Sequence, residues 1–397
     1  MSSGTKIQVA EEDRFSRLRL ISWWDQQKIA AARVLVIGAG AIGNELLKNL
    51  ALLGFLQIVV VDLDSIEISN LSRSVLFSEA DIGTGKAEAA ARSIKRISPA
   101  TVTRPLAANV LSEIGLGLFD WADVVLGGLD NREARLWLNR ACWRMNKPFI
   151  DGAIEGINGV ARVFLPGIPP CYECTLGKVD WEILQHRLSC NLLTRAEMES
   201  GKVPTTPTSA SIIAAIEVQE ALKLIHGIKS LSGEAFVFEG MNHTSYKVAY
   251  TENPDCMSHH THELVVRLPI RSGETTLHEL WSRAKSELGG NVVIEFSREV
   301  IQKLVCPLCN DEEEIFGAVG TVPYERGRCR CSGEMRVVQT AQTYTGSETF
   351  GSRHLNELGL PVYDVFVARN DDTECAYLIE GDAAEVLGEL SSTQERE

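Results

Sequence analysis

The run Arg33-Val-Leu-Val-Ile-Gly38-Ala-Gly40-Ala-Ile-Gly43 joins a short apolar stretch to three spaced glycines. The apolar stretch is rich in β-branched residues, which predicts a buried strand. The residues that follow, 44–54, place leucines at helical spacing and end at a glycine, which predicts a helix. A glycine loop between a strand and a helix is typical of sites that hold nucleotide phosphates at the helix N-terminus.

Apolar strand patterns and amphipathic helix patterns alternate through the rest of the first 250 residues. This alternation predicts an α/β fold with a doubly wound, mainly parallel Rossmann-like sheet. Strands are predicted at 33–38, 58–62, 123–127 and 148–151, and helices at 14–32, 44–54, 86–97 and 209–226.

The composition changes around residues 253–262, where we expect the first domain to end. Beyond it, a helix pattern at 277–288 and strand patterns at 292–296 and 362–367 predict a smaller α+β domain. Cysteines, glycines and prolines between the two strands indicate an insert in this domain.

The chain has 397 residues, of which 45% are hydrophobic and 23% charged, as expected of a globular protein. Its apolar runs are too short to span a membrane, and no basic-then-apolar signal pattern opens the sequence. We therefore expect a cytoplasmic location and no membrane partner. The net charge is −14, and residues 265–397 carry 13 Lys/Arg against 23 Asp/Glu. Such an acidic tail argues against nucleic acid and suits either a basic protein partner or a solubilising surface.

Polar and charged residues follow the predicted strands of the nucleotide site. On its own the glycine loop with an aspartate at the end of the next strand fits NAD as well as ATP. Hydride transfer has no need of basic residues beside the phosphates, whereas cleavage between the α- and β-phosphates needs them to stabilise pyrophosphate, and an aspartate to hold Mg²⁺. The residues in question are Asp62, Asp64, Asn70, Arg73, Lys86, Asp130, Asn131 and Arg132.

These motifs resemble those of the ubiquitin-activating enzyme superfamily of ThiF/MoeB-like adenylyltransferases, over about residues 12–256. The resemblance rests on Gly38-x-Gly40-x-x-Gly43, Asp62-x-Asp64, Ser69-Asn70-Leu71-x-Arg73, Asp81-Ile-Gly-x-x-Lys86 and Asp130-Asn131. It implies ATP as the nucleotide, with Asp62 on the ribose. It also implies Asn70, Arg73 and Lys86 on the phosphates and Asp130 on the magnesium. Ser74 stands where family members usually have glutamine.

The segment Arg14-Phe-Ser-Arg17 resembles the N-terminal Arg-x-x-Arg of the same superfamily. There the second arginine reaches the phosphates of a partner subunit. The resemblance therefore implies a homodimer in which Arg17 acts in the site of the other copy.

A cysteine at position 190 lies in a polar stretch ahead of the loop at 202–208 and the predicted helix at 209–226. A single cysteine is more often a small buried residue than a nucleophile. However, Arg187, Arg195 and His186 lie nearby and can favour the thiolate. In family members that activate ubiquitin-like proteins, a thioester-forming cysteine lies in this crossover segment, which implies that role for Cys190. Cys142, on an apolar helix, and Cys375, in a terminal strand, fit a buried role better.

Cys171 and Cys174 form a C-x2-C pair, the usual way for one turn to supply two tetrahedral metal ligands. The second half of the site lies far downstream at Cys256 and His259. The superfamily often has a structural zinc at these two places, held by four cysteines. Here the fourth ligand is expected to be His259, with His260 and His262 as alternatives.

A second C-x2-C pair and a C-x-C pair lie 19 residues apart in the C-terminal domain, flanked by glycine and proline. This spacing indicates a zinc ribbon. The four residues are Cys306, Cys309, Cys329 and Cys331. Both sites have four protein ligands, so we expect two structural Zn²⁺ ions and no catalytic one.

The expected organisation is a disordered N-terminus at 1–12, an adenylation domain at 13–262 with a crossover loop at 178–208, and a C-terminal domain at 263–390. The C-terminal domain weakly resembles the ubiquitin-fold domain of eukaryotic activating enzymes, with a zinc-ribbon insert at about 304–334.

The expected function is activation of a ubiquitin-like protein and its transfer to a conjugating enzyme. The architecture resembles activating enzymes of bacterial ubiquitin-like conjugation operons, which implies a link to phage defence. Three alternatives remain at this point: a sulfur-carrier adenylyltransferase, a NAD-dependent oxidoreductase and a zinc-containing adaptor.

Overall fold

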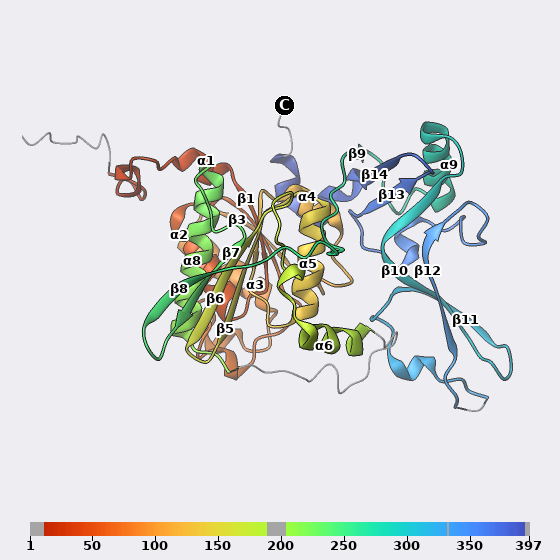
Figure 1. Cartoon of the computed structure of the whole chain (residues 1–397), viewed down its shortest axis with the longest axis horizontal. Helices are drawn as coiled ribbons and strands as arrows, with labels where there is room; N and C mark the ends of the chain where they lie inside the picture. Colours follow the sequence, from red (N-terminus) through yellow and green to blue (C-terminus); the bar gives the residue numbers. More distant parts are fainter. Residues whose placement is uncertain (1–11, 189–203, 332, 394–397) are drawn as a thin grey trace, which may run out of the picture.

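The computed structural model describes residues 12–188, 204–331 and 333–393. Figure 1 shows a large sheet flanked by helices, with a second, smaller sheet beside it. The α/β fold class with a mainly parallel large sheet is confirmed. Within the described residues, no helix is long and apolar enough to cross a membrane.

The large sheet has eight strands in the order β3-β2-β1-β4-β5-β6-β7-β8. The first five strands of this order are parallel and the last three pairings are antiparallel. The strands are β1 (Arg33–Ile37), β2 (Gln57–Val61), β3 (Val102–Leu106), β4 (Val124–Gly127), β5 (Phe149–Glu155), β6 (Asn158–Phe164), β7 (Glu234–Glu239) and β8 (Thr244–Ala249).

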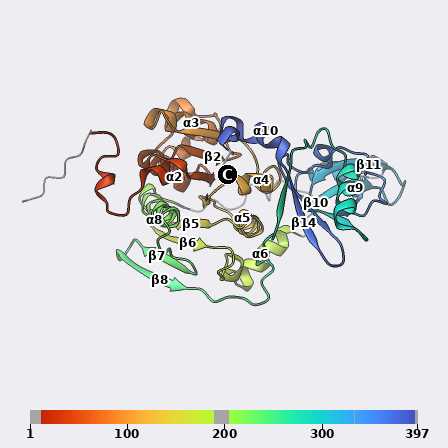
Figure 2. The ribbon, with the colours of Figure 1, turned by 90° about the horizontal axis from the view of Figure 1, so that it is seen from above.

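Helices cover both faces of this sheet, because alternate residues of its central strands point to opposite sides. Val34 and Val36 of β1 join one core with α2, α3 and α8, whereas Leu35 and Ile37 join another with α4 and α5. Figure 2 shows α2 and α8 on one side of the strands and α4 and α5 on the other. The helices are α1 (Gln26–Ala31), α2 (Ala41–Leu53), α3 (Lys86–Ile97), α4 (Leu116–Trp121), α5 (Arg132–Arg144), α6 (Lys178–Leu188) and α8 (Pro207–Ile225), with short 3-10 turns η1 (Leu18–Leu20), η2 (Ile68–Asn70), η3 (Glu79–Asp81) and η4 (Glu173–Thr175).

The helix predicted at 14–32 is wrong in its first half. Only η1 and α1 form there, and α1 begins after Asp25, whose side chain accepts hydrogen bonds from the backbone N–H groups of Gln27 and Lys28. An N-cap of this kind starts a new helix, so the apolar periodicity before it reflects packing of separate turns.

The second sheet has the order β11-β10-β13-β14-β9, and β12 also pairs with β10. All its pairings are antiparallel except that of β14 with β9. Strand β10 runs unbroken into the cysteine region, so that region extends the sheet. The elements are β9 (Val265–Leu268), α9 (Leu277–Leu288), β10 (Val293–Val305), β11 (Glu312–Ala318), η5 (Tyr324–Gly327), β12 (Val337–Tyr344), η6 (Leu355–Leu358), β13 (Val365–Arg369), β14 (Glu374–Ile379), η7 (Glu380–Asp382), α10 (Ala383–Leu387) and η8 (Gly388–Thr393).

The two sheets share a tight seam. Asp364 Oδ1 accepts a 2.7 Å hydrogen bond from the backbone N–H of Leu116, and the N–H of Gly117 donates to the carbonyl of Tyr363 at 3.0 Å. A Cβ atom on Gly117 would lie 2.5 Å from that carbonyl oxygen. Arg298 donates to the carbonyls of Leu111 and Ile114 across the same seam.

After the second sheet, the chain returns to the first one. Residues of α10 and η8, among them Leu387 and Leu390, are buried in the core of the large sheet. Arg104 of β3 donates to the carbonyls of Val386 and Glu385, each at 2.9 Å. This segment therefore covers β3, the edge strand of the large sheet.

Candidate active site and metal centres

The three glycines of the loop after β1 differ in why a side chain is absent. Gly38 has φ +93°, and a Cβ there would lie 2.6 Å from the carbonyl oxygen of Gly128. A Cβ on Gly43 would lie 1.9 Å from the carbonyl oxygen of Gly38. Gly40, the N-cap of α2, has nothing within 4 Å of a Cβ position. The outer glycines are thus required by packing, and the middle one leaves open space at a helix N-terminus, where an anion is stabilised.

Asp62 follows β2 directly and is held against this loop. Its Oδ2 accepts a hydrogen bond from Ala39 N at 2.7 Å, and its Oδ1 accepts one from Asp64 N at 2.8 Å. Burial raises the pKa of Asp62, while the nearby charge of Lys86 lowers it. The side chain therefore presents a fixed acceptor at the carboxyl end of the strand, where a ribose hydroxyl can donate to it.

Lys86 is the first residue of α3 and forms an ion pair with Asp64, with Nζ 2.6 Å from Oδ2. Its backbone N–H also donates to the carbonyl of Asp64 at 2.9 Å. The lysine side chain is only 13% exposed, whereas that of Asp64 is 57% exposed. The lysine is thus held in place close to Asp62 while its partner faces solvent.

Asn70 and Arg73 lie on the segment between β2 and α3. Asn70 is buried, and its Oδ1 accepts a hydrogen bond from Glu67 N at 2.9 Å, which closes a capping box around η2. Arg73 donates from Nη1 to the carbonyl of Ser69 at 2.7 Å. Ser74 is buried.

Asn44 joins this segment to the glycine loop and was not foreseen from the sequence. Its Nδ2 donates to the carbonyls of Ala39 and Gly40, at 2.6 and 3.1 Å, and its Oδ1 accepts from Leu76 N at 2.9 Å. The asparagine is fully buried. The only signal in the sequence is an amide on the apolar side of a helix, which must be hydrogen-bonded if it is buried.

Asp130 is exposed just after β4, at the same end of the sheet as Asp62. Asn131 is the N-cap of α5 and accepts a hydrogen bond from Ala134 N at 2.7 Å. Arg132 pairs with Asp180 of α6, at 2.7 Å, so its side chain is committed to that helix.

A buried charge cluster lies beneath the loop that carries Asp130, and it too was not predicted. Asp151, fully buried, pairs with Arg135 at 2.9 Å and with Arg162 at 2.5 Å. Arg135 also donates to the carbonyl of Leu129, next to Asp130, at 2.5 Å. Burial raises the pKa of Glu217, beside this cluster, well above its usual value. Arg135 thus ties the loop to Asp151 of β5, which Arg162 of β6 also holds.

Arg17 and Cys190 are the remaining expected site residues. Arg17 is exposed and directly precedes η1. Cys190 and Arg195 lie outside the described residues, as do the side chains of His186 and Arg187.

Both ends of the segment with Cys190 are described. It follows α6 and ends where the carbonyl of Pro204 accepts from Gly156 N at 2.7 Å. Cys142 and Cys375 are buried, and burial raises the pKa of each thiol.

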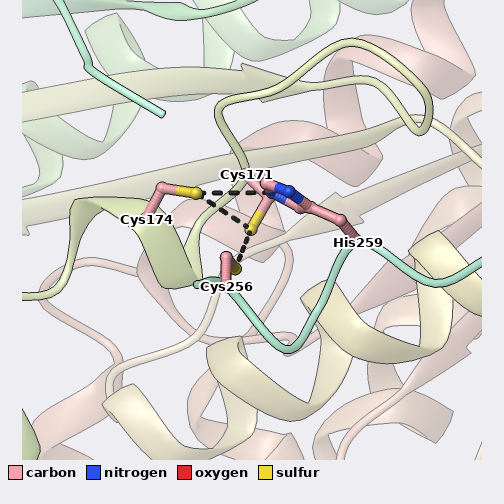
Figure 3. Close-up of side chains that lie close together, drawn as sticks. All are labelled: Cys171, Cys174, Cys256 and His259. Carbon is pink, nitrogen blue, oxygen red and sulfur yellow. Dashed lines mark hydrogen bonds between the residues drawn. The ribbon is translucent and has the colours of Figure 1, made fainter. Parts of the chain in front are cut away.

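A first cluster of metal-type side chains, here named the inner cluster, consists of Cys171, Cys174, Cys256 and His259. Figure 3 shows the four side chains turned toward one another. Cys171 Sγ lies 3.8 Å from Cys174 Sγ and 3.5 Å from Cys256 Sγ, and Cys174 Sγ lies 3.3 Å from His259 Nε2. Such spacings suit tetrahedral zinc, whose bonds to sulfur and nitrogen are about 2.3 and 2.0 Å. The structure thus places His259 in this cluster, with His260 and His262 elsewhere.

The remaining four cysteines, Cys306, Cys309, Cys329 and Cys331, form the outer cluster. Cys306 Sγ lies 3.6 Å from Cys331 Sγ, and Cys309 Sγ lies 3.7 Å from Cys329 Sγ. The hydrogen bond from the backbone N–H of Cys331, together with bonds from the neighbouring thiols, lowers the pKa of Cys329 to about 6. A set of four convergent thiols with a stabilised thiolate fits a zinc ion well.

The sequence model of the ThiF family matches residues 13–258, so this chain belongs to the ThiF family. The NEDD8-activating enzyme E1 catalytic subunit of Schizosaccharomyces pombe is 40% identical over 151 residues, which cover 37% of this chain and 34% of that protein. The SAMP-activating enzyme E1 of Haloferax volcanii is 30% identical over 261 residues, 63% of this chain and 89% of that protein.

The crystal structure of E. coli MccB with ATP is 25% identical, with a TM-score of 0.52, and covers 64% of this chain and 76% of that one. These similarities confirm the resemblance to the ubiquitin-activating superfamily. This chain is an E1-like member of an ATP-using family. It spans about a third of the length of the NEDD8-activating subunits that it matches.

Proposed function

We propose that this protein uses ATP to adenylate the C-terminal carboxylate of a ubiquitin-like protein, accepts the acyl group on Cys190 as a thioester, and passes it to a conjugating enzyme. The observation that supports the proposal is that Asp62, Lys86 and Asp130 follow parallel strands at the same end of the large sheet, where Gly40 leaves open space at the N-terminus of α2. Relatives named as activating enzymes for NEDD8, SUMO and SAMP support the ubiquitin-like substrate.

In the proposed adenylation, the N-terminus of α2 and the open backbone at Gly40 hold the phosphates, and Asp62 accepts from the ribose. An oxygen of the substrate carboxylate attacks the α-phosphorus, the bond to the bridging oxygen breaks, and pyrophosphate leaves. Lys86, Arg73 and Asn70 stabilise the charge that develops on the leaving group. The exposed carboxylate of Asp130 would hold Mg²⁺, which would supply further positive charge beside the leaving group.

The second and third steps are acyl transfers. The thiolate of Cys190 attacks the carbonyl of the acyl-adenylate, and AMP leaves. The thiolate of the conjugating enzyme then attacks the thioester and releases Cys190. Each step exchanges one activated acyl bond for another. The transfer is thereby divided into steps that each have a lower activation barrier than a direct transfer would have.

The domain organisation belongs to the same proposal. We take residues 13–262 as the adenylation domain, with a crossover loop at 178–208 that carries Cys190. Residues 263–390 are proposed as a ubiquitin-fold-like domain with the zinc-ribbon insert at about 304–334, which recruits the conjugating enzyme. A homodimer that places Arg17 in the partner's site fits its exposed position. A cytoplasmic location and a role in phage defence complete the proposal.

Each cluster is proposed to hold one structural Zn²⁺. The inner cluster offers three thiols and one imidazole, and the outer cluster four thiols. All of the ligand atoms converge, and neither set leaves a coordination position for substrate, so the ions stabilise the fold and take no part in the transfer.

One alternative has a specific observation in its favour. The chain is also similar to MccB, which has been crystallised with ATP and with MccA and is not named as an activating enzyme. A sulfur-carrier adenylyltransferase that stops at the adenylate, without Cys190 chemistry or a conjugating enzyme, is the second candidate.

The adenylation step is tested by Asp130→Ala in an ATP–pyrophosphate exchange assay with a ubiquitin-like substrate. Loss of the magnesium ligand is expected to abolish exchange. Lys86→Ala is expected to lower the rate about 100-fold or more, as removal of a preorganised electrostatic group does. Asp371→Ala, which removes an exposed aspartate in the turn between β13 and β14, is the matched control. Normal exchange in Asp130→Ala would overturn the assignment.

The thioester step is tested by Cys190→Ala on a non-reducing gel with ATP and the ubiquitin-like protein. This variant should still support exchange but form no thiol-sensitive adduct, and transfer to a conjugating enzyme should stop. Cys190→Ser is expected to trap a more stable oxyester. An adduct that persists in Cys190→Ala and disappears in Cys375→Ala would move the chemistry to the second sheet. Exchange without any adduct in the wild type favours the sulfur-carrier alternative.

A further inference from the structure

Three side chains outside both cysteine clusters converge where the two sheets meet. His260 and His262 lie on the segment between Cys256 and β9, and Glu374 is the first residue of β14. Glu374 Oε1 lies 2.9 Å from His262 Nδ1 and 3.3 Å from His260 Nε2. The two imidazole rings are perpendicular, with centroids 5.3 Å apart. Two histidines from one segment thus meet a single carboxylate oxygen from the other sheet.

The spacing of these ligand atoms fits a shared metal ion. Bonds of about 2.0–2.2 Å from zinc to nitrogen and oxygen, at angles between right and tetrahedral, put neighbouring ligand atoms about 2.9–3.4 Å apart. The two measured distances fall in this range, and all three atoms lie within 4.8 Å of one another. Both histidines direct a ring nitrogen at the same carboxylate oxygen, as two ligands of one shared ion do.

The cluster is held firmly on one side and open on the other. The His262 side chain is 4% exposed, and the backbone N–H of this residue donates to the carbonyl of Arg144 at 3.0 Å. The His260 side chain is 52% exposed, so solvent reaches the cluster from that side. An ion there would keep water or another exchangeable ligand.

Arg369 contacts the same carboxylate, but on its other oxygen. Its Nη2 lies 2.9 Å from Glu374 Oε2 and 3.3 Å from Glu295 Oε2. Oε1 is therefore left to the histidines. The positive charge of the guanidinium repels a metal cation bound nearby. A metal ion should therefore bind more weakly here than at the inner or the outer cluster.

We propose that His260, His262 and Glu374 form a third metal site, which binds a divalent transition-metal ion such as Zn²⁺ reversibly. Two imidazoles and one carboxylate are the ligand set of a borderline ion, and neither Ca²⁺ nor Mg²⁺ favours it. The ion joins the segment that follows the inner cluster to strand β14. The site is independent of the proposed transfer reaction, because none of its residues lies at the nucleotide end of the large sheet.

The test is zinc stoichiometry of the full-length protein, equilibrated with free Zn²⁺ in a weak chelator buffer and measured by elemental analysis. Wild-type protein should bind one more ion per chain than His260→Ala or Glu374→Gln. Glu295→Gln is the matched control, because it removes a negative charge from the same arginine but touches neither histidine; it should retain the additional ion. Equal stoichiometry in wild type and Glu374→Gln would overturn the proposal.

A cobalt-loaded sample separates this site from the inner cluster, whose His259 precedes His260. The charge-transfer absorption of cobalt–thiolate bonds should have the same intensity in His260→Ala and wild type, since the lost ion has no sulfur ligand. Thermal unfolding without added metal should also be unchanged in this variant, because the side chain is exposed. A stoichiometry loss accompanied by a weaker thiolate band would assign the lost ion to the inner cluster and reject the third site.

Discussion

The inner and outer clusters offer similar ligands, yet they are embedded in different ways. Cys171 is fully buried, and the two halves of the inner cluster are 85 residues apart in the chain. His259 stacks on Trp143 of α5, with ring centroids 4.5 Å apart. In the outer cluster, Cys309 and Cys331 are exposed. A metal ion in the inner cluster therefore connects distant parts of the large-sheet unit, by which we mean the large sheet and the helices that pack on it. A metal ion in the outer cluster connects only two neighbouring turns.

The residues between the ligands reinforce this difference. Glu173 lies between Cys171 and Cys174, is buried, and accepts two hydrogen bonds from Arg140 and one from Ser258. The inner cluster thus shares its turn with a buried ion pair. In the outer cluster, backbone N–H groups of the turns donate to Cys306 and Cys329, and the nearby ion pairs of Arg336 are with acidic side chains that are partly open to solvent. The same ligand chemistry should therefore have unequal consequences when it is removed.

The largest effect is expected for Cys171→Ser. Loss of a ligand to a buried structural zinc should lower the free energy of unfolding by more than about 5 kcal/mol, which is comparable to the whole stability of many domains. Denaturant unfolding and soluble yield measure it. Cys142→Ser, the same change at a fully buried cysteine outside the clusters, should lower stability by only about 1–3 kcal/mol. Equal losses in both variants would mean that the inner cluster holds no ion.

Cys306→Ser should have a smaller and more local effect. One Zn²⁺ per chain should be lost, and amide exchange should speed up around residues 306–331, while ATP–pyrophosphate exchange stays within about twofold of wild type. Mass-spectrometric hydrogen exchange and metal analysis give both readings. Loss of nucleotide chemistry in this variant would contradict the contrast between the clusters.

The contact at Gly117 determines how strongly the unfolding of the second sheet is coupled to that of the first. The methyl group in Gly117→Ala would meet the carbonyl of Tyr363, and relief of this overlap should lower stability by about 1–3 kcal/mol. Gly177→Ala is the control, because the nearest atom to its Cβ lies at 3.7 Å. Two separate unfolding transitions are expected in Gly117→Ala, as the units lose their coupling. A stability equal to that of the control would show that the seam is loose.

The last comparison concerns pH in the interior of the large-sheet unit. Burial raises the pKa of Glu217 above its unfolded value of 4.5. The stabilisation associated with its protonated form is complete below pH 4.5 and is lost as pH rises toward the folded-state pKa. Relative to wild type, Glu217→Gln should therefore gain stability between pH 5 and 8, by at most about 1.4 kcal/mol per pH unit.

Glu220→Gln, by contrast, should be destabilised, because Glu220 pairs with Lys223 and accepts from Leu231 N. Unfolding free energies measured across this pH range compare the two variants. A pH-independent difference between Glu217→Gln and wild type would contradict the raised pKa.

The features that the sequence predicted well are those that neighbours in the chain determine. The strand, glycine loop and helix around Gly38 need only local periodicity and turn chemistry. The predicted start of α2 at Asn44 is three residues late, because the helix already begins at Ala41 after the cap at Gly40. Helix α9 was predicted at its observed bounds, since Thr276 and Glu279 form a capping box that is visible in the sequence.

The features that escaped prediction depend on distant partners. The residues next to Asp151 in the sequence do not indicate that it will form buried ion pairs with two arginines. Asn44 acts through Leu76, 32 residues away. The choice among three nearby histidines for the inner cluster also depended on the path of the segment in space, which spacing alone does not fix. The prediction ended strand β10 at Phe296, nine residues too early. The second half of this strand is stabilised by pairing with β11 and β12, which the local sequence does not reveal.

The cover that α10 and η8 form over β3 has a consequence for biosynthesis. Arg104 cannot donate its hydrogen bond to the carbonyl of Glu385 until that residue, 281 positions further along the chain, has been synthesised. At translation rates of about 5–20 residues per second, that partner is synthesised roughly 15–60 s later. Until then the apolar core surface that Leu387 and Leu390 cover in the folded protein is exposed on the nascent chain, and exposed apolar surface favours aggregation. The large-sheet unit thus cannot be completed as its own residues emerge from the ribosome, and a chaperone that shields β3 during this interval should raise the yield of folded protein.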